Sequence, residues 1–462
     1  MTPYEATGFG TDPWWIILIK VVFVFVFLLA ITIFNVWFER RLVGKMQHRK
    51  GPIMNGPFGL GQALADGAKL IFKEDFRPAG TDKWIFNLAP LLTGTAAFTS
   101  WSVIPLAGEV NMFGYTTRLQ LTDLPVSVLF VLAIASIGIY GIVLAGWASS
   151  STYALLGGIR STAQMISYEI AMGLSLVGVF MWSQSMSTSV IVEKQAEPLG
   201  ILPALHLPSW HALLLIPSCV IFVIAMVAET NRAPFDLVEC EQELVSGFLT
   251  DYSGFRYAIY FLAEYINMAT VSAVATTLFF GGYHAPWPIP WLVSAVPALA
   301  WLDSGWMGLF WFVVKVLLFI AMFVWLRGTL PRFRYDQFMD LGWKWLIPIS
   351  LAWIVLLAVL RTAINLQWFS PQILLAAAGV FLVLAIIYAF AGRRGDAEEP
   401  ESEISRTPDY EQGEFDPFAG GYPVPPMPGQ VLPEFAGVVR SASVADDATI
   451  PRSRVAVEEE VL

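Results

Sequence analysis

The sequence predicts an all-α protein: a polytopic bundle of transmembrane helices with a cytoplasmic amphipathic helix and a disordered C-terminal tail. Hydrophobic residues make up 56% of the 462 residues, charged residues only 14%, and the chain contains 18 tryptophans, a composition typical of membrane proteins. The formal net charge of -10 does not describe the membrane part, because the last 70 residues alone carry 15 acidic and 6 basic side chains. The preceding chain is nearly neutral, as expected for a protein embedded in lipid.

Nine apolar runs are long enough to cross about 30 Å of hydrocarbon. They lie at residues 14–37, 88–107, 125–147, 161–182, 212–228, 257–281, 309–327, 345–361 and 371–391. We expect eight of them to form a common core and the ninth to be an extra C-terminal span, so that residues 1–391 make one membrane domain. The first run lacks a preceding basic segment and a cleavage site of small residues, which predicts a retained anchor and not a signal peptide.

Lysine and arginine are distributed unevenly between the two sets of connections. The loop at 38–87 carries nine of them: Arg40, Arg41, Lys45, Arg49, Lys50, Lys69, Lys73, Arg77 and Lys83. The connection at 327–344 carries Arg327, Arg332, Arg334 and Lys344, whereas the opposite set of loops holds only Arg118, Lys194 and Arg361. Because basic residues accumulate in cytoplasmic loops, both basic connections are predicted to be cytoplasmic, with the N-terminus outside and the C-terminal tail inside.

The segment from Phe58 to Lys73 has the periodicity of an amphipathic helix. Its apolar side is formed by Leu60, Leu64, Gly67, Leu70 and Ile71, and its polar side by Gln62, Asp66, Lys69 and Lys73. Helices of this kind lie at lipid interfaces. The pattern leaves two hypotheses open: a helix that rests on the membrane, or a helix that forms the lip of a cavity opening toward the bilayer.

The predicted cytoplasmic loop at 228–256 is strongly acidic and lies between two apolar runs. Its acidic residues are Glu229, Asp236, Glu239, Glu241, Glu243 and Asp251, and up to Asp251 only Arg232 opposes them. A helix beginning after Pro234 would place Asp236, Glu239 and Glu243 on one face. Crowded carboxylates resist simultaneous ionisation, which raises some of their pKa values and favours proton exchange.

Two further glutamates are predicted to lie near the middle of the membrane. Glu169 follows Arg160 by nine residues and Glu264 follows Arg256 by eight. In a helix these spacings place the two glutamates about 13 and 12 Å beyond the respective arginines. A charge at this depth costs roughly 3 kcal/mol or more. The pair indicates a proton or ion path; the alternative is two protonated acids, each hydrogen-bonded to a neighbouring helix.

Two lysines lie near the outer ends of their predicted spans. Lys20 and Lys315 are each five or six residues from that end. A lysine so placed can extend its ammonium group toward the headgroups. We expect Lys20 to do so, whereas the pattern around Lys315 does not favour one role.

Residues 392–462 are predicted to form a disordered, acidic, proline-rich cytoplasmic tail, because they lack apolar periodicity.

The chemistry of electron carriers is missing from the chain. Cys219 and Cys240 are too few for an iron–sulfur cluster, the four histidines have no metal-ligand spacing, and no glycine-rich nucleotide fingerprint is present. The sequence therefore indicates proton handling, binding of a lipid-soluble ligand, or both.

Six segments, in order between residues 38 and 348, resemble one family. They are ERRLVGKMQHRKGP, GPFGLGQALADGAKLIFKED, GGIRSTAQMISYE, AETNRAPFDLVECEQELVSGF, FLAEYINM and LPRFRYDQFMDLGWKWLIP. They are similar to the H subunit of bacterial NADH:quinone oxidoreductase, respiratory complex I, whose mitochondrial counterpart is the first NADH dehydrogenase subunit. The resemblance implies a proton-translocating enzyme in which this subunit joins the electron-carrying arm to the membrane arm and forms most of a narrow quinone chamber.

The resemblance also implies roles for individual residues. The implied quinone chamber contains Arg40, Asp66, Phe235, Arg332 and Arg334, and the implied proton path runs through Glu169, Glu229, Glu239, Glu241, Glu243 and Glu264. Quinone is then a substrate, and FMN and the iron–sulfur clusters belong to partner subunits, so this chain is expected to bind no cofactor or metal. The expected partners are soluble quinone-site and iron–sulfur subunits and small membrane subunits beside the antiporter-like ones, in the bacterial inner (plasma) membrane.

Three other hypotheses stay open at this point. The chain could be the corresponding membrane subunit of a membrane-bound hydrogenase or of a dehydrogenase with another electron donor, which the co-purifying catalytic subunits would decide. It could be a self-contained cation/proton transporter, which should move protons when reconstituted alone. A purely structural anchor for a peripheral complex would explain the basic loops but not the acids at the middle of the membrane.

Overall fold

The structure, a computed structural model, describes residues 12–197, 208–236, 245–296 and 301–366. Its helices are α1 (Trp14–Met46), α2 (Gly61–Phe72), α3 (Lys83–Thr99), α4 (Ser127–Ala148), α5 (Thr152–Ser183), α6 (Thr188–Ala196), α7 (His211–Leu214), α8 (Ile216–Glu229), α10 (Gly254–Phe279), α11 (Ile289–Ala295), α12 (Trp306–Thr329), α13 (Tyr335–Asp340) and α14 (Ile347–Asn365). Strands β1 (Ala107–Met112) and β2 (Tyr115–Leu119) form one antiparallel hairpin.

The predicted all-α membrane bundle is confirmed. Within the described residues, six helices are long and apolar enough to cross a membrane: α1, α4, α5, α10, α12 and the continuous run Tyr335–Ala363. The predicted spans at 88–107 and 212–228 correspond to the shorter helices α3 and α8. The predicted ninth span at 371–391 and the tail lie outside the described residues.

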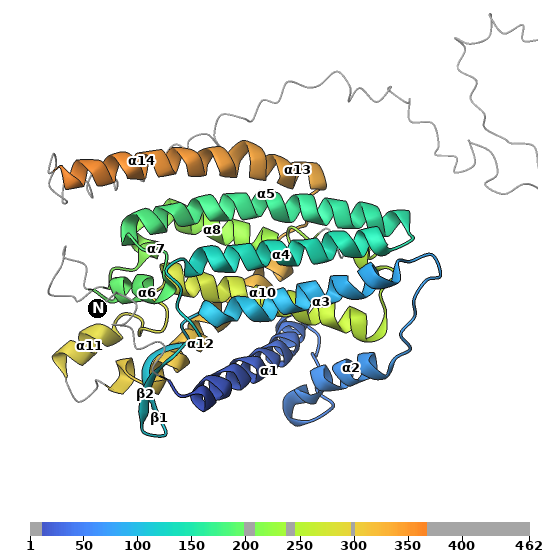
Figure 1. The fold of residues 1–462 in the computed structure, drawn as a ribbon, viewed down its shortest axis with the longest axis horizontal. Coiled ribbons are helices and arrows are strands. Elements are labelled where there is room, and N and C mark those ends of the chain that lie inside the picture. Colours follow the sequence, from blue (N-terminus) through green and yellow to red (C-terminus); the bar gives the residue numbers. More distant parts are fainter. Residues whose placement is uncertain (1–11, 198–207, 237–244, 297–300, 367–462) are drawn as a thin grey trace, which may run out of the picture. The chain divides into compact units, whose positions relative to one another are not determined.

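Most of the long helices lie side by side in the same general direction (Figure 1). Helix α5 packs between α4 and α8 and also contacts α14, while α10 contacts α1, α3, α8 and α12. The hairpin and α6 lie at one end of the bundle, which we call the hairpin end; α2 lies toward the opposite end, which we call the α2 end (Figure 1). The chain thus offers two distinct ends along the direction in which the spans run.

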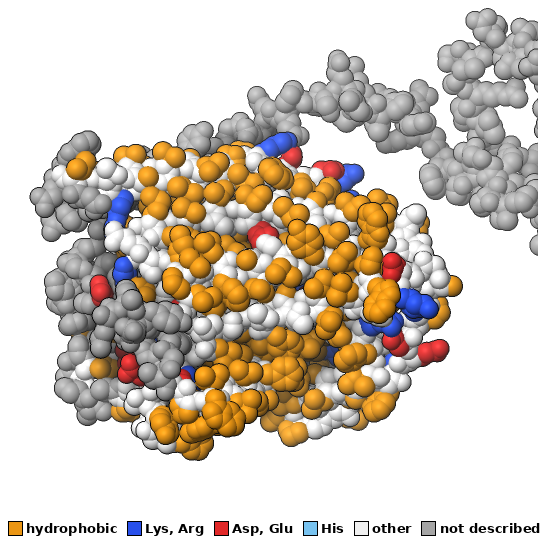
Figure 2. All heavy atoms as spheres, in the orientation of Figure 1, with side chains coloured by type: hydrophobic (Ala, Val, Ile, Leu, Met, Phe, Trp, Pro, Cys, Tyr) orange, Lys and Arg blue, Asp and Glu red, His pale blue; other side chains and the backbone are white. Residues whose placement is uncertain are grey.

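Hydrophobic side chains cover most of the face seen in Figure 2, whereas lysine, arginine, aspartate and glutamate gather near the connection between α2 and α3. Many large apolar side chains on the spans are open to the surroundings; Leu318, Val355 and Tyr140 are each more than 60% exposed. Exposed apolar surface of this extent is costly in water. It is the expected surface of a bundle that sits in lipid.

The hairpin between α3 and α4 was not anticipated from hydropathy. Helix α3 ends at Thr99 and not near residue 107, and the chain passes through a short 3₁₀ turn into β1. Its reversal places Phe113 at φ 53° and Gly114 at φ 88°. Two consecutive positive φ angles fit the tight turn that matches the natural twist of paired strands. The signal in the sequence was therefore a local turn. Hydropathy averaged over a long stretch of residues does not show such a turn.

Lys20 differs from the predicted snorkelling lysine. Its side chain is 5% exposed, and its Nζ lies 2.6 Å from Asp12 Oδ2 and 2.6 Å from Thr117 Oγ1 on β2. The charge is neutralised inside the protein instead of reaching the headgroups. The hydrogen bonds that Thr117 makes with both members of the ion pair fasten the start of α1 to the hairpin.

Candidate functional site

A cavity of about 950 Å³ lies among α3, α4, α5 and α10. It is also lined by α8 and the segment after it, by the 3₁₀ turn η5 (Gly247–Leu249), and by the end of α12 and the segment after it. Its apolar wall includes Ala97, Val131, Leu132, Met172, Phe222 and Val274. Its polar wall includes Glu229, Asp236, Glu264, Arg327, Arg332 and Arg334. Cavities of this size that combine an apolar wall with a few polar groups are typical of sites for small ligands.

The polar wall is shaped by the end of α8. This helix stops at Glu229, and the chain reverses at Asn231, which has a φ of 50°. Gln164 on α5 donates one amide hydrogen bond to the carbonyl of Ala228 at 2.8 Å and another to that of Phe235 at 2.9 Å. Helix α5 therefore holds both sides of the reversal and fixes the first part of the acidic loop against the cavity.

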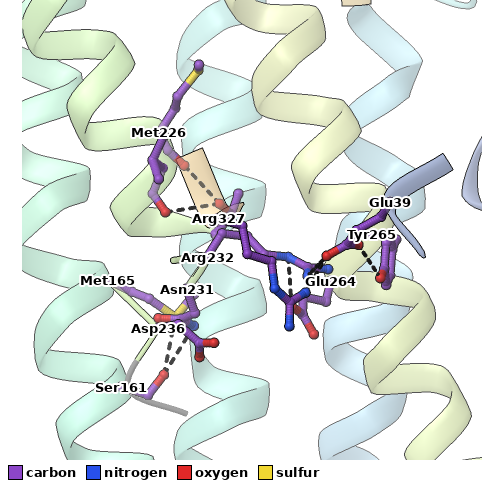
Figure 3. A network of polar contacts seen from close by, with 12 residues as sticks. Glu39, Ser161, Met165, Met226, Asn231, Arg232, Asp236, Glu264, Tyr265 and Arg327 are labelled. Atoms are coloured by element: carbon purple, nitrogen blue, oxygen red, sulfur yellow. Dashed lines mark hydrogen bonds and ion pairs between the residues drawn. The ribbon is translucent and has the colours of Figure 1, made fainter. Parts of the chain in front are cut away.

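Glu39 is a buried member of a network of polar contacts (Figure 3). Arg232 Nη1 lies 3.4 Å from its Oε1, Arg327 contacts the same oxygen, and the Tyr265 hydroxyl donates a hydrogen bond to Oε2 at 2.6 Å. The network joins α1, α10, α12 and the loop after α8. Because one carboxylate is shared by two guanidinium groups, the arrangement depends on every member being present.

Glu264 is tied into the same network. Its Oε1 lies 3.2 Å from Arg232 Nε, and the Arg232 guanidinium lies 4.5 Å from the centre of the Tyr265 ring. The side chain is 28% exposed and lines the cavity. Glu264 is therefore not isolated from other charged groups, because it contacts a buried arginine.

The predicted chamber residues fall into two groups. Phe235, Arg332 and Arg334 lie at the α2 end of the cavity region: Arg332 approaches Asp236 at 3.6 Å, and the Phe235 ring stacks on Phe333 at 5.5 Å between centroids. Arg332 and Arg334 line the cavity directly. These positions provide cationic groups beside an aromatic cluster.

Arg40 and Asp66 form the second group. They pair with each other at 2.5 Å, which joins α1 to the amphipathic helix α2, and Gln62 donates a further hydrogen bond to Asp66 at 3.2 Å. Neither residue is among the described residues that line the cavity. The predicted amphipathic helix is confirmed as α2, and its polar side is fastened to the end of the first span.

Glu229 and Glu169 lie close enough to influence each other electrostatically. Glu229 is 3% exposed, lines the cavity, and its Oε2 accepts no hydrogen bond from the described residues. Glu169 accepts a 2.5 Å hydrogen bond from Ser136 on α4. The predicted path residues Glu239, Glu241 and Glu243, and with them the helix expected after Pro234, lie outside the described residues.

Sequence reasoning missed Glu39, Arg232, Tyr265 and Arg327 as members of the site. Glu39 and Arg327 stand at span ends, where Arg327 is an ordinary topology anchor and Glu39 directly precedes two others, Arg40 and Arg41. Arg232 was visible only as the single base among the acids. The available signal was a glutamate still within the helical run of the first span, because such a residue requires a partner when the helix is packed.

The cavity wall depends on a close contact between two glycines. A Cβ atom built on Gly157 of α5 would lie 2.5 Å from Gly247 Cα, immediately before the lining residues Phe248 and Leu249. We expect Gly157→Ala to displace this segment at a cost of about 1–3 kcal/mol and to lower activity, measured as thermal stability and turnover of the assembled protein.

The control for this prediction is Gly173→Ala on the same helix, where the added Cβ meets nothing within 4 Å. This change should leave the wall intact and slightly favour the helix. Equal behaviour of the two variants would show that the glycine contact does not shape the cavity.

Comparison with known proteins agrees with the six matching segments. The family model described as NADH dehydrogenase matches residues 19–358. The chain is 59% identical to the NADH-quinone oxidoreductase H subunit of Cutibacterium acnes over 96% of this chain and 98% of that protein. It is 50% identical to the protein of the same name from Streptomyces avermitilis, over 94% and 92% of the two chains, and 52% identical to that of Frankia alni, over 86% and 84%. The chain therefore belongs to the NADH dehydrogenase family of membrane subunits that includes these three relatives.

Proposed function

We propose that this chain is the quinone-chamber and proton-path subunit of a proton-translocating NADH:quinone oxidoreductase, respiratory complex I. The observation that carries the proposal is the cavity, whose apolar wall continues into a charged end formed by Glu229, Glu264, Asp236, Arg332 and Arg334. The relatives from three bacteria are all named as subunits of an enzyme that acts on NADH and quinone, which favours this function over the hydrogenase, the independent transporter and the structural anchor.

The cavity matches the chemistry of a lipid-soluble quinone. An apolar tail is accommodated by the wall around Val131, Met172 and Phe222, where burial provides the binding energy. The head is polar and takes up two electrons and two protons on reduction, so it belongs near groups that donate hydrogen bonds and move protons. Arg332 and Arg334 provide such donors at the charged end.

Electrons are supplied by other subunits in this proposal. The chain contains only two cysteines, one of them Cys219 on α8, whereas a cysteine-ligated cluster needs four. FMN and iron–sulfur clusters therefore belong to soluble partners that dock beside the charged end. The small membrane subunits would receive the proton signal on the other side.

Protons would pass between the charged end and the interior through Glu229, Glu169 and Glu264, with Glu239, Glu241 and Glu243 continuing the path in the acidic loop. Charges about 6 Å apart couple by roughly 3 kcal/mol at an effective dielectric constant near 20. A change of charge on the quinone thus changes the electrostatic potential at the nearest carboxyl groups. Arg232 connects Glu264 to Glu39 and can redistribute this charge.

The Arg40 and Asp66 pair would act at the entrance and not in the body of the chamber. It holds α2 against α1, and the outward side of α2 presents Leu64, Ile71 and Phe72, each at least 58% exposed. Such a surface suits contact with the bilayer from which quinone arrives. The proposed location is the bacterial plasma membrane, with the α2 end on the cytoplasmic side, the N-terminus outside and the tail in the cytoplasm.

Photolabelling with an azido-quinone tests the proposal in the assembled complex. We expect labelled peptides from the cavity wall, and we expect Ala135→Trp on α4, which lines the cavity, to weaken quinone binding about 5- to 150-fold, the equivalent of about 1–3 kcal/mol. The matched control is Ala133→Trp on the exposed side of the same helix, which should leave the quinone KM unchanged. Labelling confined to surfaces away from the cavity, or equal effects of the two tryptophans, would refute the quinone chamber.

A further inference from the structure

Lys315 on α12 is buried and fully hydrogen-bonded at the hairpin end. Its Nζ donates to the backbone carbonyls of Phe280 at 2.6 Å, Gly282 at 2.9 Å and His284 at 2.7 Å. An ammonium group has three N–H donors and no acceptor. All three donors are therefore used by carbonyl oxygen atoms that belong to one turn.

This turn is built around the lysine. Helix α10 ends at Phe279, and Gly281 and Gly282 follow with φ angles of 72° and 52°, a backbone conformation that glycine adopts without steric cost. The turn can therefore bring alternate carbonyls to one point. The ring of Trp210 lies 5.0 Å from Lys315 Nζ, within the range of a cation–π contact.

Two other buried side chains form hydrogen bonds with the end of α10 and the turn that follows it. Gln195 on α6 donates to the carbonyl of Thr277 at 2.8 Å and accepts from the backbone N–H of Gly281 at 2.9 Å. His211 Nδ1 lies 2.9 Å from the carbonyl of Leu278. We call Lys315, the turn 280–284, Gln195 and His211 the lysine cap.

The lysine cap follows directly after the part of α10 that lines the cavity. The cavity reaches Thr270 and Val274, and Phe280 is six residues further along the chain, which corresponds to about 9 Å of helix. The residues between them, including Thr276 and Phe279, are buried. The cap thus lies at the hairpin end of α10, beyond the last residue of this helix that lines the cavity.

Other titratable groups near the cap are Asp303, His284, Tyr283, Glu193, Arg118 and Lys194. Asp303 accepts a hydrogen bond from the backbone N–H of Ala285 at 2.9 Å, and Glu193 pairs with Arg118 at 2.9 Å. Burial lowers the pKa of His284, against the opposing effect of the Asp303 carboxylate. Lys315 is the basic side chain that directs all three of its donors into the turn 280–284.

We propose that the lysine cap is a proton barrier, which keeps protons in the cavity from crossing this chain to the hairpin end. The ammonium group of Lys315 would repel protons, as cationic residues do in channels that exclude them, and the carbonyls that accept its hydrogen bonds are not free to organise a chain of water. This inference rests on the proposed function, because it assigns to the cavity a closed end on the side that faces away from the acidic loop.

The test is passive proton leak of the assembled complex in sealed vesicles without NADH or quinol. A pH gradient is imposed and its decay followed with a pH-sensitive dye. Lys315→Met should accelerate the protein-dependent decay about tenfold, as expected when roughly 1.4 kcal/mol is removed from a barrier, whereas Lys315→Arg keeps the charge and should behave as the wild type. Lys20→Met is the matched control, because Lys20 is also a buried lysine of the hairpin end but contacts Asp12 and Thr117 instead of the cap.

Each outcome decides the matter. Unchanged decay in Lys315→Met, or equal leak in Lys20→Met, overturns the barrier. If Lys315→Met does not assemble, Gln195→Leu decides in its place: it opens the cap without removing the charge, and a gradient held as well as in the wild type again overturns the proposal. Because no quinone takes part, a failed barrier is distinguishable from a failed quinone chamber, which photolabelling reports.

Discussion

Replacing Glu229 by glutamine is expected to abolish most proton pumping while the complex still assembles. Glutamine preserves the size and hydrogen-bonding shape of the side chain but cannot exchange a proton. Glu229 lines the cavity, is 3% exposed and lies near Glu169, so no bulk water can replace its function. We expect NADH-driven acidification to fall by at least about a hundredfold, the scale of a positioned proton-transfer group, with coupled quinone reduction lowered as well.

The measurement is NADH-driven acidification of proteoliposomes, compared with the amount of assembled complex. Glu193→Gln is the control, because this glutamate is on α6 at the hairpin end and 47% exposed. It should pump as the wild type does. Full pumping by both variants would remove Glu229 from the proton path. Glu264→Gln is expected to have a mixed effect, because it also removes the ion-pair partner of Arg232.

Replacing Glu39 by glutamine is expected to impair assembly more than any single change in the cavity wall. The substitution would leave Arg232 and Arg327 without their shared carboxylate. Removing one partner of a buried ion pair costs about 3–5 kcal/mol, and the contact between Glu264 and Arg232 would offset only part of this cost. The expected result is a much lower yield of assembled complex and a lower midpoint of thermal unfolding in detergent or nanodiscs.

Two further variants separate charge from packing. Tyr265→Phe removes one hydrogen bond to Glu39 and should cost only about 1–3 kcal/mol. The double variant Glu39→Gln with Arg327→Met removes one of the two cations and should recover part of the loss, a coupling that a double-mutant cycle measures. Wild-type stability of Glu39→Gln would show that the network does not hold the four elements together.

Hydropathy and periodicity predicted the class of the protein and the location of most of its described long helices. These signals are local: an apolar run long enough for lipid is visible without knowing its neighbours. The amphipathic helix at Gly61–Phe72 was predicted for the same reason. Matching segments then determined the family. The hairpin after α3 was missed because Phe113 and Gly114 act through backbone conformation, which hydropathy does not record.

The tertiary structure decided which charges meet. Glu264 lies within α10, but its partner Arg232 comes from the reversal after α8. Arg40 and Asp66 belong to the predicted chamber by resemblance, yet they contact each other between α1 and α2 and not the cavity wall. Partners in different helices are separated by tens to hundreds of residues, so helical spacing within one segment does not specify them.

The sequence was therefore enough to identify the acidic residues, whereas the groups that surround each of them were decided by the packing of the helices. Glu229 faces a cavity, Glu39 is shared by two arginines, and Lys315 is enclosed by a turn of carbonyls. Each environment arises from contacts between elements that are distant in the chain. The physical reason is that the energy of a buried charge depends on the dipoles and charges that surround it in three dimensions.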